Sequence, residues 1–255
     1  MKHIVFYSGG IASYCTAKRV VKQHGAENTI LLFTDTKYEH EDLYRFLHES
    51  AKKLGVDVTI IADGRTPWEV FKDERFLGNS RIDPCSRILK RDLAKQWVKS
   101  NFPDPASCML YLGLASDERH RLDRSRRNWN PYQVESTIVD LPAFTKNDMR
   151  MEVELDGLAI PELYDLGFPH NNCGGFCIKA GQAHFKHLLK VLPEKYAEVE
   201  KNEEEMREML GDVSILRDRR NGTTKTLTLK QFRERNRDEC NLLDWGGCGC
   251  FGDEE

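Results

Sequence analysis

The sequence predicts an α/β fold: a doubly wound, mostly parallel sheet with helices on both faces, followed by a cysteine-containing C-terminal extension. Two observations predict it. Apolar strand-like segments alternate with amphipathic helix-like segments through the first half, and a glycine-bearing turn joins the first strand to the first helix. Strands separated by helices of this length require crossover connections, which give a parallel sheet covered on both faces.

The individual elements follow in chain order. The predicted strands are His3–Tyr7, Thr29–Thr34, Val56–Ile61 and Met109–Leu114. The predicted helices are Ile11–His24, Glu41–Leu54, Pro67–Lys72, Ser86–Lys99, Gly181–Lys190 and Pro193–Leu210. A further short strand is expected within Thr224–Leu229, where Thr and Leu alternate. From about residue 140 the strand–helix rhythm breaks, and Pro161–Gly181 is predicted to be an ordered loop rich in Gly, Pro, Asn and Cys.

The bulk composition fits a globular protein. The chain has 255 residues, of which 40% are hydrophobic and 31% charged, with a net charge of −3. This length suits one large domain or a domain with an appendage, and we expect a main domain over residues 1–190 and an extension over 191–255 packed on it. No apolar run approaches the roughly 20 residues that a membrane span needs. The chain enters a strand directly, so we expect no secretory signal, no membrane contact and a cytoplasmic location.

The first loop has the composition of a phosphate-binding turn. Ser8-Gly9-Gly10-Ile11-Ala12-Ser13 lies between the first strand and the first helix. Glycines allow close backbone approach to a phosphate, and the helix N-terminus supplies unpaired N–H groups and the positive end of a dipole. The spacing differs from the Walker loop and from the dinucleotide fingerprint. We expect Ser8, Gly9, Gly10 and Ser13 to bind phosphate.

Further polar residues follow the other strands, whose carboxyl ends should meet at the same edge of the sheet. Thr34 and Asp35 are predicted to contact the nucleoside or a metal ion, and Gly113 to line the same site. Lys90, Arg119 and Arg121 are the cations predicted to neutralise phosphate charge. The alternative interpretations are a helix cap or local turn for Asp35 and ordinary surface positions for the cations.

The order of these motifs resembles one known family. A Ser-Gly-Gly loop, Phe33-Thr34-Asp35-Thr36 before an acidic helix, a Cys-x-x-x-Leu-Lys segment ending at Lys90 and a Gly-x-x-x-x-Glu-Arg segment starting at Gly113 occur in sequence. They resemble the phosphoadenosine-phosphosulfate reductase-like branch of the PP-loop ATP pyrophosphatase (adenine nucleotide alpha hydrolase-like) superfamily. The resemblance covers roughly residues 3–190 and includes Pro161–Phe168 with the cysteines that follow.

The resemblance implies an adenine-nucleotide site that takes ATP or an adenylyl-sulfate. In ATP-using members the loop holds the pyrophosphate leaving group, usually with Mg²⁺. The family's loop Asp is replaced here by Ala12. Mg²⁺ would therefore be held through the nucleotide and other carboxylates such as Asp35, or else the substrate carries no pyrophosphate.

Eight cysteines in a chain predicted to be cytoplasmic favour metal or thiol chemistry over a disulfide framework. Cys173-Gly-Gly-Phe-Cys177 can wrap a metal or cluster, and Cys85 is added to it by the resemblance. The four interpretations are a [4Fe–4S] cluster, a structural Zn²⁺ site, a redox thiol relay and inert thiols. A fourth ligand would come from Cys240, Cys248 or Cys250, or the fourth position would be left open. His170 and His184 flank this region as further candidate ligands.

Three hypotheses of function follow. The leading one is an enzyme that adenylates a substrate, or handles an adenylylated one, and couples this to sulfur transfer at the cysteine cluster. Its acceptor would be a small molecule or a nucleic acid. The nucleic acid is suggested by the basic segment Arg217–Arg237, which contains eight basic and two acidic residues. The second is a thiol-dependent reductase of phosphoadenylyl- or adenylyl-sulfate that uses Cys248 or Cys250, although the tail lacks the His of that branch's Cys-Gly-x-His segment. The third is a non-catalytic nucleotide-sensing module with structural zinc.

Overall fold

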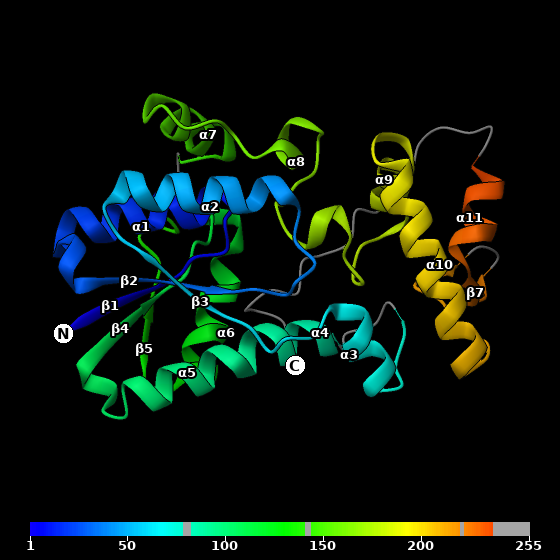
Figure 1. Ribbon diagram of the computed structural model, residues 1–255, viewed down its shortest axis with the longest axis horizontal. Coiled ribbons are helices and arrows are strands. Elements are labelled where there is room, and N and C mark those ends of the chain that lie inside the picture. Colours follow the sequence, from blue (N-terminus) through cyan, green and yellow to red (C-terminus); the bar gives the residue numbers. More distant parts are fainter. Residues whose placement is uncertain (79–82, 141–143, 220–221, 237–255) are drawn as a thin grey trace.

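A single parallel sheet organises the first part of the molecule (Figure 1). The computed structural model describes residues 1–78, 83–140, 144–219 and 222–236. The sheet has the order β3-β2-β1-β4-β5, and all neighbouring strands are parallel. Its strands are β1 (Lys2–Phe6), β2 (Thr29–Thr34), β3 (Val58–Ile61), β4 (Cys108–Tyr111) and β5 (Gln133–Glu135). The predicted doubly wound α/β class is confirmed.

The helices alternate with the strands and then continue alone. Those of the sheet region are α1 (Ile11–His24), α2 (Glu41–Leu54), α3 (Pro67–Asp73), α4 (Pro84–Ser86), a π-helical turn (Arg87–Asp92), α5 (Leu93–Asn101) and α6 (Arg119–Trp129). They are followed by α7 (Lys146–Leu155), α8 (Glu162–Asp165), α9 (Gln182–Val191), α10 (Pro193–Leu210) and α11 (Leu229–Arg235). A two-stranded antiparallel ribbon, β6 (Leu216–Asp218) with β7 (Lys225–Leu227), precedes α11.

The near-continuous apolar strands are explained by cores on both faces of the sheet. In β1, Ile4 and Phe6 pack into one core, whereas Val5 and the following Tyr7 pack into the other. Side chains alternate between faces along a strand, so a strand buried on both sides must be apolar throughout. In Figure 1, α1 and α2 cover one face and α5 and α6 lie on the other.

A third core lies beside the sheet rather than on it. It combines Trp68 and Phe71 of α3 with residues of α9, α10 and α11, including Phe185, Tyr196 and Phe232. Residues far apart in sequence therefore share one apolar cluster. The predicted division at residue 190 stays a prediction, since α9 and α10 on either side of it belong to this same core.

Several predicted elements differ in detail. In place of the predicted helix Ser86–Lys99, the chain forms α4, the π-helical turn and α5 in succession. The predicted strand Met109–Leu114 ends at Tyr111. The predicted strand Thr224–Leu229 is only Lys225–Leu227, because Thr228 caps α11 through a reciprocal capping box with Gln231. The short strand β5 and helices α6 and α7 were not predicted. None of the helices in the described ranges is long and apolar enough to cross a bilayer.

A buried carboxylate fastens the segment after α10. Glu203 is fully buried, and its Oε1 and Oε2 accept hydrogen bonds from the backbone N–H groups of Ile215 (2.8 Å) and Leu229 (2.5 Å). Glu203→Leu leaves both donors without this acceptor, at roughly 1–3 kcal/mol each. We expect the free energy of unfolding to fall by roughly 2–6 kcal/mol in urea titrations. The exposed neighbour offers a control, Glu204→Leu, which should change it by less than about 0.5 kcal/mol.

The same residue predicts a pH dependence. Burial raises the pKa of Glu203 to about 7, above its usual 4.5. The folded state therefore binds a proton that the unfolded state has released, so this contribution to stability is complete below about pH 4.5 and is lost as pH rises to about 7. The difference in unfolding free energy between wild type and Glu203→Leu should shrink across that window. A difference that is constant from pH 4.5 to 7 would contradict this assignment.

Candidate functional site

The sheet creates a crevice at its carboxyl edge. The chain runs from β1 to β2 and β3 on one side and to β4 and β5 on the other, so β1 and β4 meet at a topological switch point. Loops leaving such a point diverge and open a ligand site. Here they border a pocket of ≈ 830 Å³, including its open mouth, which we call the switch-point pocket. It is lined by the loop after β1, by residues 112–115 after β4, by α6 and α7 residues and by residues 169–172.

The loop after β1 has the geometry expected of an anion site. Gly9 has φ +73°, and a Cβ there would lie 2.8 Å from Leu43 Cγ, so the turn requires glycine. Gly10 is the N-cap of α1, whose first turn contains no acidic residue. Ser13 Oγ donates to the Gly10 carbonyl (2.8 Å), which ties the loop to the helix. The N-terminus of a 14-residue helix therefore opens into the pocket beside Ser8 and Gly10.

Gly113 fixes the second wall against the first. A Cβ on this residue would lie 2.6 Å from Ser13 N and 2.8 Å from Ala12 C. The chain after β4 thus runs in direct contact with the backbone of the α1 start. Of the residues predicted to bind phosphate or nucleoside, Ser8, Gly10, Ser13 and Gly113 line the switch-point pocket, and Gly9 shapes its loop.

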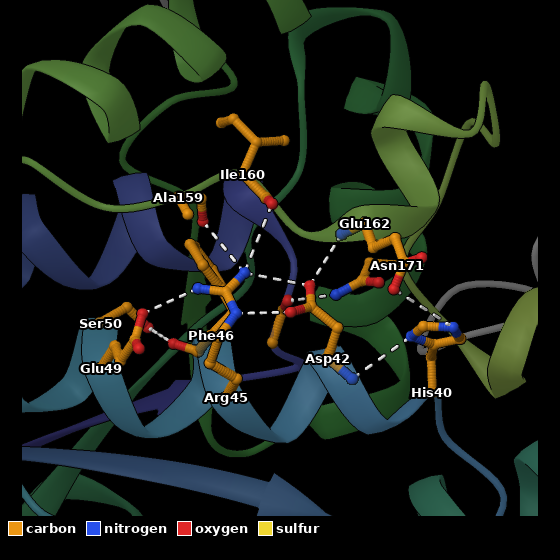
Figure 2. Close-up of polar contacts among 11 residues, drawn as sticks. His40, Asp42, Arg45, Phe46, Glu49, Ser50, Ala159, Ile160, Glu162 and Asn171 are labelled. Atoms are coloured by element: carbon orange, nitrogen blue, oxygen red, sulfur yellow. Dashed lines mark hydrogen bonds and ion pairs between the residues drawn. The ribbon is translucent and has the colours of Figure 1, made fainter.

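Helix α2 holds the chain that enters α8 (Figure 2). Arg45 Nη2 donates to the carbonyls of Ala159 (3.3 Å) and Ile160 (3.4 Å). Asp42 Oδ2 accepts from the backbone N–H of Glu162 (2.8 Å), and Asp42 is itself paired with Arg45. The chain entering α8 is thereby fixed to the start of α2. This helix also carries Leu43, which packs against Gly9 of the phosphate loop.

The lining of the switch-point pocket combines charged side chains with a neutral histidine. Arg121, whose side chain is 12% exposed, lines it and pairs with Glu118, and Lys146 of α7 adds a second cation. Burial lowers the pKa of His170 to about 4, so this ring is neutral near pH 7. The other predicted cation, Arg119, lies outside the lining: its side chain is 63% exposed and pairs with Asp140.

The two arginines provide a matched test. Arg121→Ala is expected to weaken the binding of a phosphate-bearing ligand, assayed with ATP, about tenfold, because it removes a charge-assisted donor from a partly desolvated wall. Arg119→Ala removes the same charge from an exposed ion pair and should change the dissociation constant less than about twofold. Isothermal titration at fixed salt measures both. Equal losses in the two variants would show that only the overall positive charge matters.

A smaller pocket of ≈ 280 Å³, which we call the middle pocket, lies at the same carboxyl edge of the sheet. It is lined by Ser8, Thr34 and Lys90. Asp35 faces its own turn instead. Its Oδ1 accepts from Lys37 N (2.9 Å) and Tyr44 OH (2.7 Å), and Oδ2 accepts from Lys37 Nζ (2.8 Å). Burial opposes ionisation, but these donors hold the pKa of Asp35 below its usual value. The contact of Asp35 with a nucleoside or metal stays a prediction.

The three cysteines predicted to act together lie around one pocket. Cys85, Cys173 and Cys177 line a cavity of ≈ 420 Å³, the thiol pocket, which Lys90 and Thr36 also border. Cys173, Gly174 and Gly175 have φ of +54°, +59° and +80°, so the turn between the thiols needs its glycines. All three cysteines are thiols rather than disulfides.

The fit of a metal to these thiols was tested on their arrangement. Among the described residues, no three Cys, His, Asp or Glu side chains converge as the ligands of one ion would. The thiols border a common space without forming a ligand set, and Cys240, Cys248 and Cys250 lie outside the described residues. A [4Fe–4S] cluster, Zn²⁺ and Mg²⁺ therefore stay predictions. The other candidate ligand, His184, is buried with Nε2 2.7 Å from the Gly175 carbonyl, a structural contact.

Sequence reasoning missed Glu39, which joins the two parts of the site. Its side chain is 1% exposed and lies 3.3 Å from Lys90 Nζ. Its carboxylate also accepts hydrogen bonds from Thr36 Oγ1 (3.0 Å) and from the backbone N–H of Cys173. In sequence it is one of several acids before α2, and such acids are usually explained by the helix dipole. No local signal distinguished it from Glu41.

The parallel sheet with a glycine-bearing loop at its switch point defines an α/β protein with a site suited to an anionic ligand. Residues 2–170 match the Phosphoadenosine phosphosulfate reductase domain, so the chain belongs to that family, a branch of the PP-loop superfamily. The match ends just before the cysteine-bearing turn. Ser8–Ser13, Lys90 and Gly113 lie within it, whereas Cys173 and Cys177 lie beyond it.

One solved structure to which the chain is similar is the crystal structure of phosphoadenylyl-sulfate (PAPS) reductase from Candida auris in a phosphate complex. The two share 14% sequence identity, with a TM-score of 0.47, and the similarity covers 66% of this chain and 79% of the reductase chain. No curated protein matches the sequence.

Proposed function

We propose that the chain binds an adenine nucleotide, ATP or an adenylyl-sulfate, in the switch-point pocket and couples it to sulfur transfer at the thiol pocket. One observation carries this proposal. Ser8 borders both the switch-point pocket and the middle pocket, and Lys90 borders both the middle pocket and the thiol pocket. The three cavities thus form a series along the carboxyl edge of the sheet, from the phosphate loop to Cys85, Cys173 and Cys177.

The residues divide the work by their chemistry. Backbone N–H groups at the start of α1 hold phosphate oxygens of the nucleotide, and Arg121 neutralises charge at the mouth. Lys90 stabilises negative charge between nucleotide and thiols.

With ATP, an acceptor oxygen attacks the α-phosphorus and pyrophosphate leaves. The terminal sulfur of a persulfide on one pocket cysteine, supplied by an external persulfide donor, then displaces AMP, and a second pocket cysteine cleaves the S–S bond and forms a disulfide. With an adenylyl-sulfate, a pocket thiolate attacks sulfur and the adenine nucleotide leaves, and a second thiol then displaces sulfite from the S-sulfonate and forms a disulfide. In both routes an external thiol reduces the disulfide. The acceptor is a small molecule or a nucleic acid.

The test separates nucleotide binding from sulfur transfer. We expect Cys173→Ser and Cys177→Ser to bind ATP and adenylyl-sulfate with wild-type affinity but to lose sulfur transfer at least 100-fold. Cys108→Ser, which alters a buried β4 thiol outside the three cavities, is the matched control and should retain both. Pyrophosphate release with candidate acceptors and sulfite or AMP release from adenylyl-sulfates are the readouts. Wild-type transfer by either pocket variant would refute the proposal.

The family match favours a second candidate, a thiol-dependent reductase of phosphoadenylyl- or adenylyl-sulfate that uses Cys248 or Cys250. It predicts sulfite formation that is lost in Cys248→Ser or Cys250→Ser and needs an external thiol reductant. Sulfite production that survives in the double variant eliminates it. A protein that binds nucleotides but converts none of them would instead be the sensing module.

A further inference from the structure

Asn171 lines the switch-point pocket, and its side-chain oxygen has no hydrogen-bond donor in the described structure. It lies between α8 and the cysteine-bearing turn, one residue beyond the family match. Its side chain is 2% exposed. Its Nδ2 donates to the Gly9 carbonyl (2.9 Å), a contact drawn in Figure 2, while its Oδ1 has no hydrogen-bond partner in the described structure.

The orientation of this amide is fixed by its neighbour. The Gly9 carbonyl can only accept, so the NH₂ group must face the phosphate loop, and the free oxygen must lie at the other edge of the planar amide. A buried acceptor without a donor is costly, and native proteins seldom leave one unsatisfied. Asn171 therefore fits a bound state in which a donor arrives from the pocket it lines.

The chemistry of the missing donor can be narrowed. Ionised phosphate and sulfate oxygens carry no proton and would be repelled by a carbonyl oxygen. The cations Arg121 and Lys146 line the same pocket and help to lower the pKa of the neighbouring His170, but neither donates a hydrogen bond to Asn171 Oδ1. A bound nucleoside supplies neutral donors for this oxygen, namely the 6-amino group of adenine and the ribose hydroxyls.

We propose that Asn171 Oδ1 accepts a hydrogen bond from a neutral donor on the nucleoside part of the nucleotide and is a specificity-determining residue of this site. The inference rests on the proposed nucleotide binding. Asn171 has two roles on the two sides of one amide: Nδ2 holds the phosphate loop at Gly9, and Oδ1 reads the nucleoside. The first role affects every nucleotide equally, whereas the second affects only those that carry the donor.

Four nucleotides test this on the full-length protein by calorimetry: AMP, IMP, 2′-deoxy-AMP and 3′-deoxy-AMP. IMP replaces the amino donor with a carbonyl, and each deoxy nucleotide lacks one hydroxyl. We expect wild type to prefer AMP about tenfold over one of them, which identifies the donor. Asn171→Leu should reduce that preference to less than about twofold. Asn171→Asp, which keeps acceptor oxygens but cannot donate to Gly9, should bind all four more weakly while keeping the preference.

Each outcome is decisive. If Asn171→Leu weakens all four nucleotides by one factor and the preference persists, Asn171 is only a loop anchor and the inference is wrong. Wild-type binding of all four with equal affinity refutes it as well, while leaving the proposed function intact. Failure of wild type to bind ATP and adenylyl-sulfate in the same calorimetric assay refutes the proposed function itself. Thermal unfolding of each variant identifies one that has not folded. If Asn171→Leu does not fold, Asn171→Ala, which also lacks the acceptor oxygen, takes its place, and a preference that persists in it refutes the inference.

Discussion

Replacing Gly113 with alanine is expected to lower nucleotide affinity by at least 100-fold. The new Cβ would lie 2.6 Å from Ser13 N, 2.7 Å from Ser13 Cα and 2.8 Å from Ala12 C. These are backbone atoms at the start of α1, so no side-chain rotation relieves the overlap. The phosphate loop and the chain after β4 must separate, and losing two backbone hydrogen bonds to a charged phosphate, at about 1.5–3 kcal/mol each, lowers affinity about 100-fold or more.

The control for this variant is another glycine with open surroundings. Gly157 has φ +76°, and nothing lies within 4 Å of a Cβ placed there. Gly157→Ala should cost about 1 kcal/mol of stability through backbone strain and leave affinity unchanged. Equilibrium dialysis with labelled ATP measures affinity, and urea unfolding measures stability. A Gly113→Ala protein that folds and binds ATP as tightly as wild type would show that the two walls are not locked together.

Breaking the buried pair of Glu39 and Lys90 is expected to destabilise the protein by about 3–5 kcal/mol for each single variant, Glu39→Leu and Lys90→Leu. The side chains are 1% and 8% exposed, so removing one partner leaves the other charge poorly solvated. The double variant removes both charges. Its loss should therefore be smaller than the sum of the single losses by at least about 2 kcal/mol, a coupling measured by a double-mutant cycle in urea.

A surface pair shows what to expect without burial. Arg126 and Glu135 lie 2.9 Å apart but are 45% and 48% exposed. Their cycle should give a coupling below about 1 kcal/mol. Additive losses in the Glu39–Lys90 cycle would mean that the two groups are stabilised independently, through their other neighbours. Glu39→Leu should also slow alkylation of the Cys173 thiol, because the Glu39 carboxylate accepts a hydrogen bond from the backbone N–H of Cys173.

The fold was predictable where local signals agree. Helices α1, α2 and α10 begin and end at the predicted residues, because Gly25, Gly55 and Gly211 stop them and Pro193 starts the third. Continuous apolar runs identified β1 and β2, since both faces of these strands are buried. The edge strand β5 has three residues with only the central one buried, too short a pattern to be recognised.

The candidate site was predictable as a set of loops but not as a set of contacts. The placement of the Ser8 loop and Gly113 at one edge follows from parallel topology alone. Glu39, Asn171 and the separation of Arg119 from the pocket depend on tertiary packing between segments more than 20 residues apart in sequence. The sequence shows that Arg119 and Arg121 both follow β4. Their ion-pair partners, Asp140 and Glu118, are tertiary or local contacts that decide which arginine lines the pocket.

The π-helical turn at Arg87–Asp92 has a consequence for how this segment tolerates changes in length. Leu89 and Ala94, five residues apart, are both fully buried, and Val98 follows Ala94 by the usual four. In an unbroken α-helix, residues five apart point about 140° away from each other. The wide turn absorbs one surplus residue, which lets Lys90 and Arg91 both turn inward. Homologues with a deletion here should lose the inward lysine, whereas those of equal length can keep it.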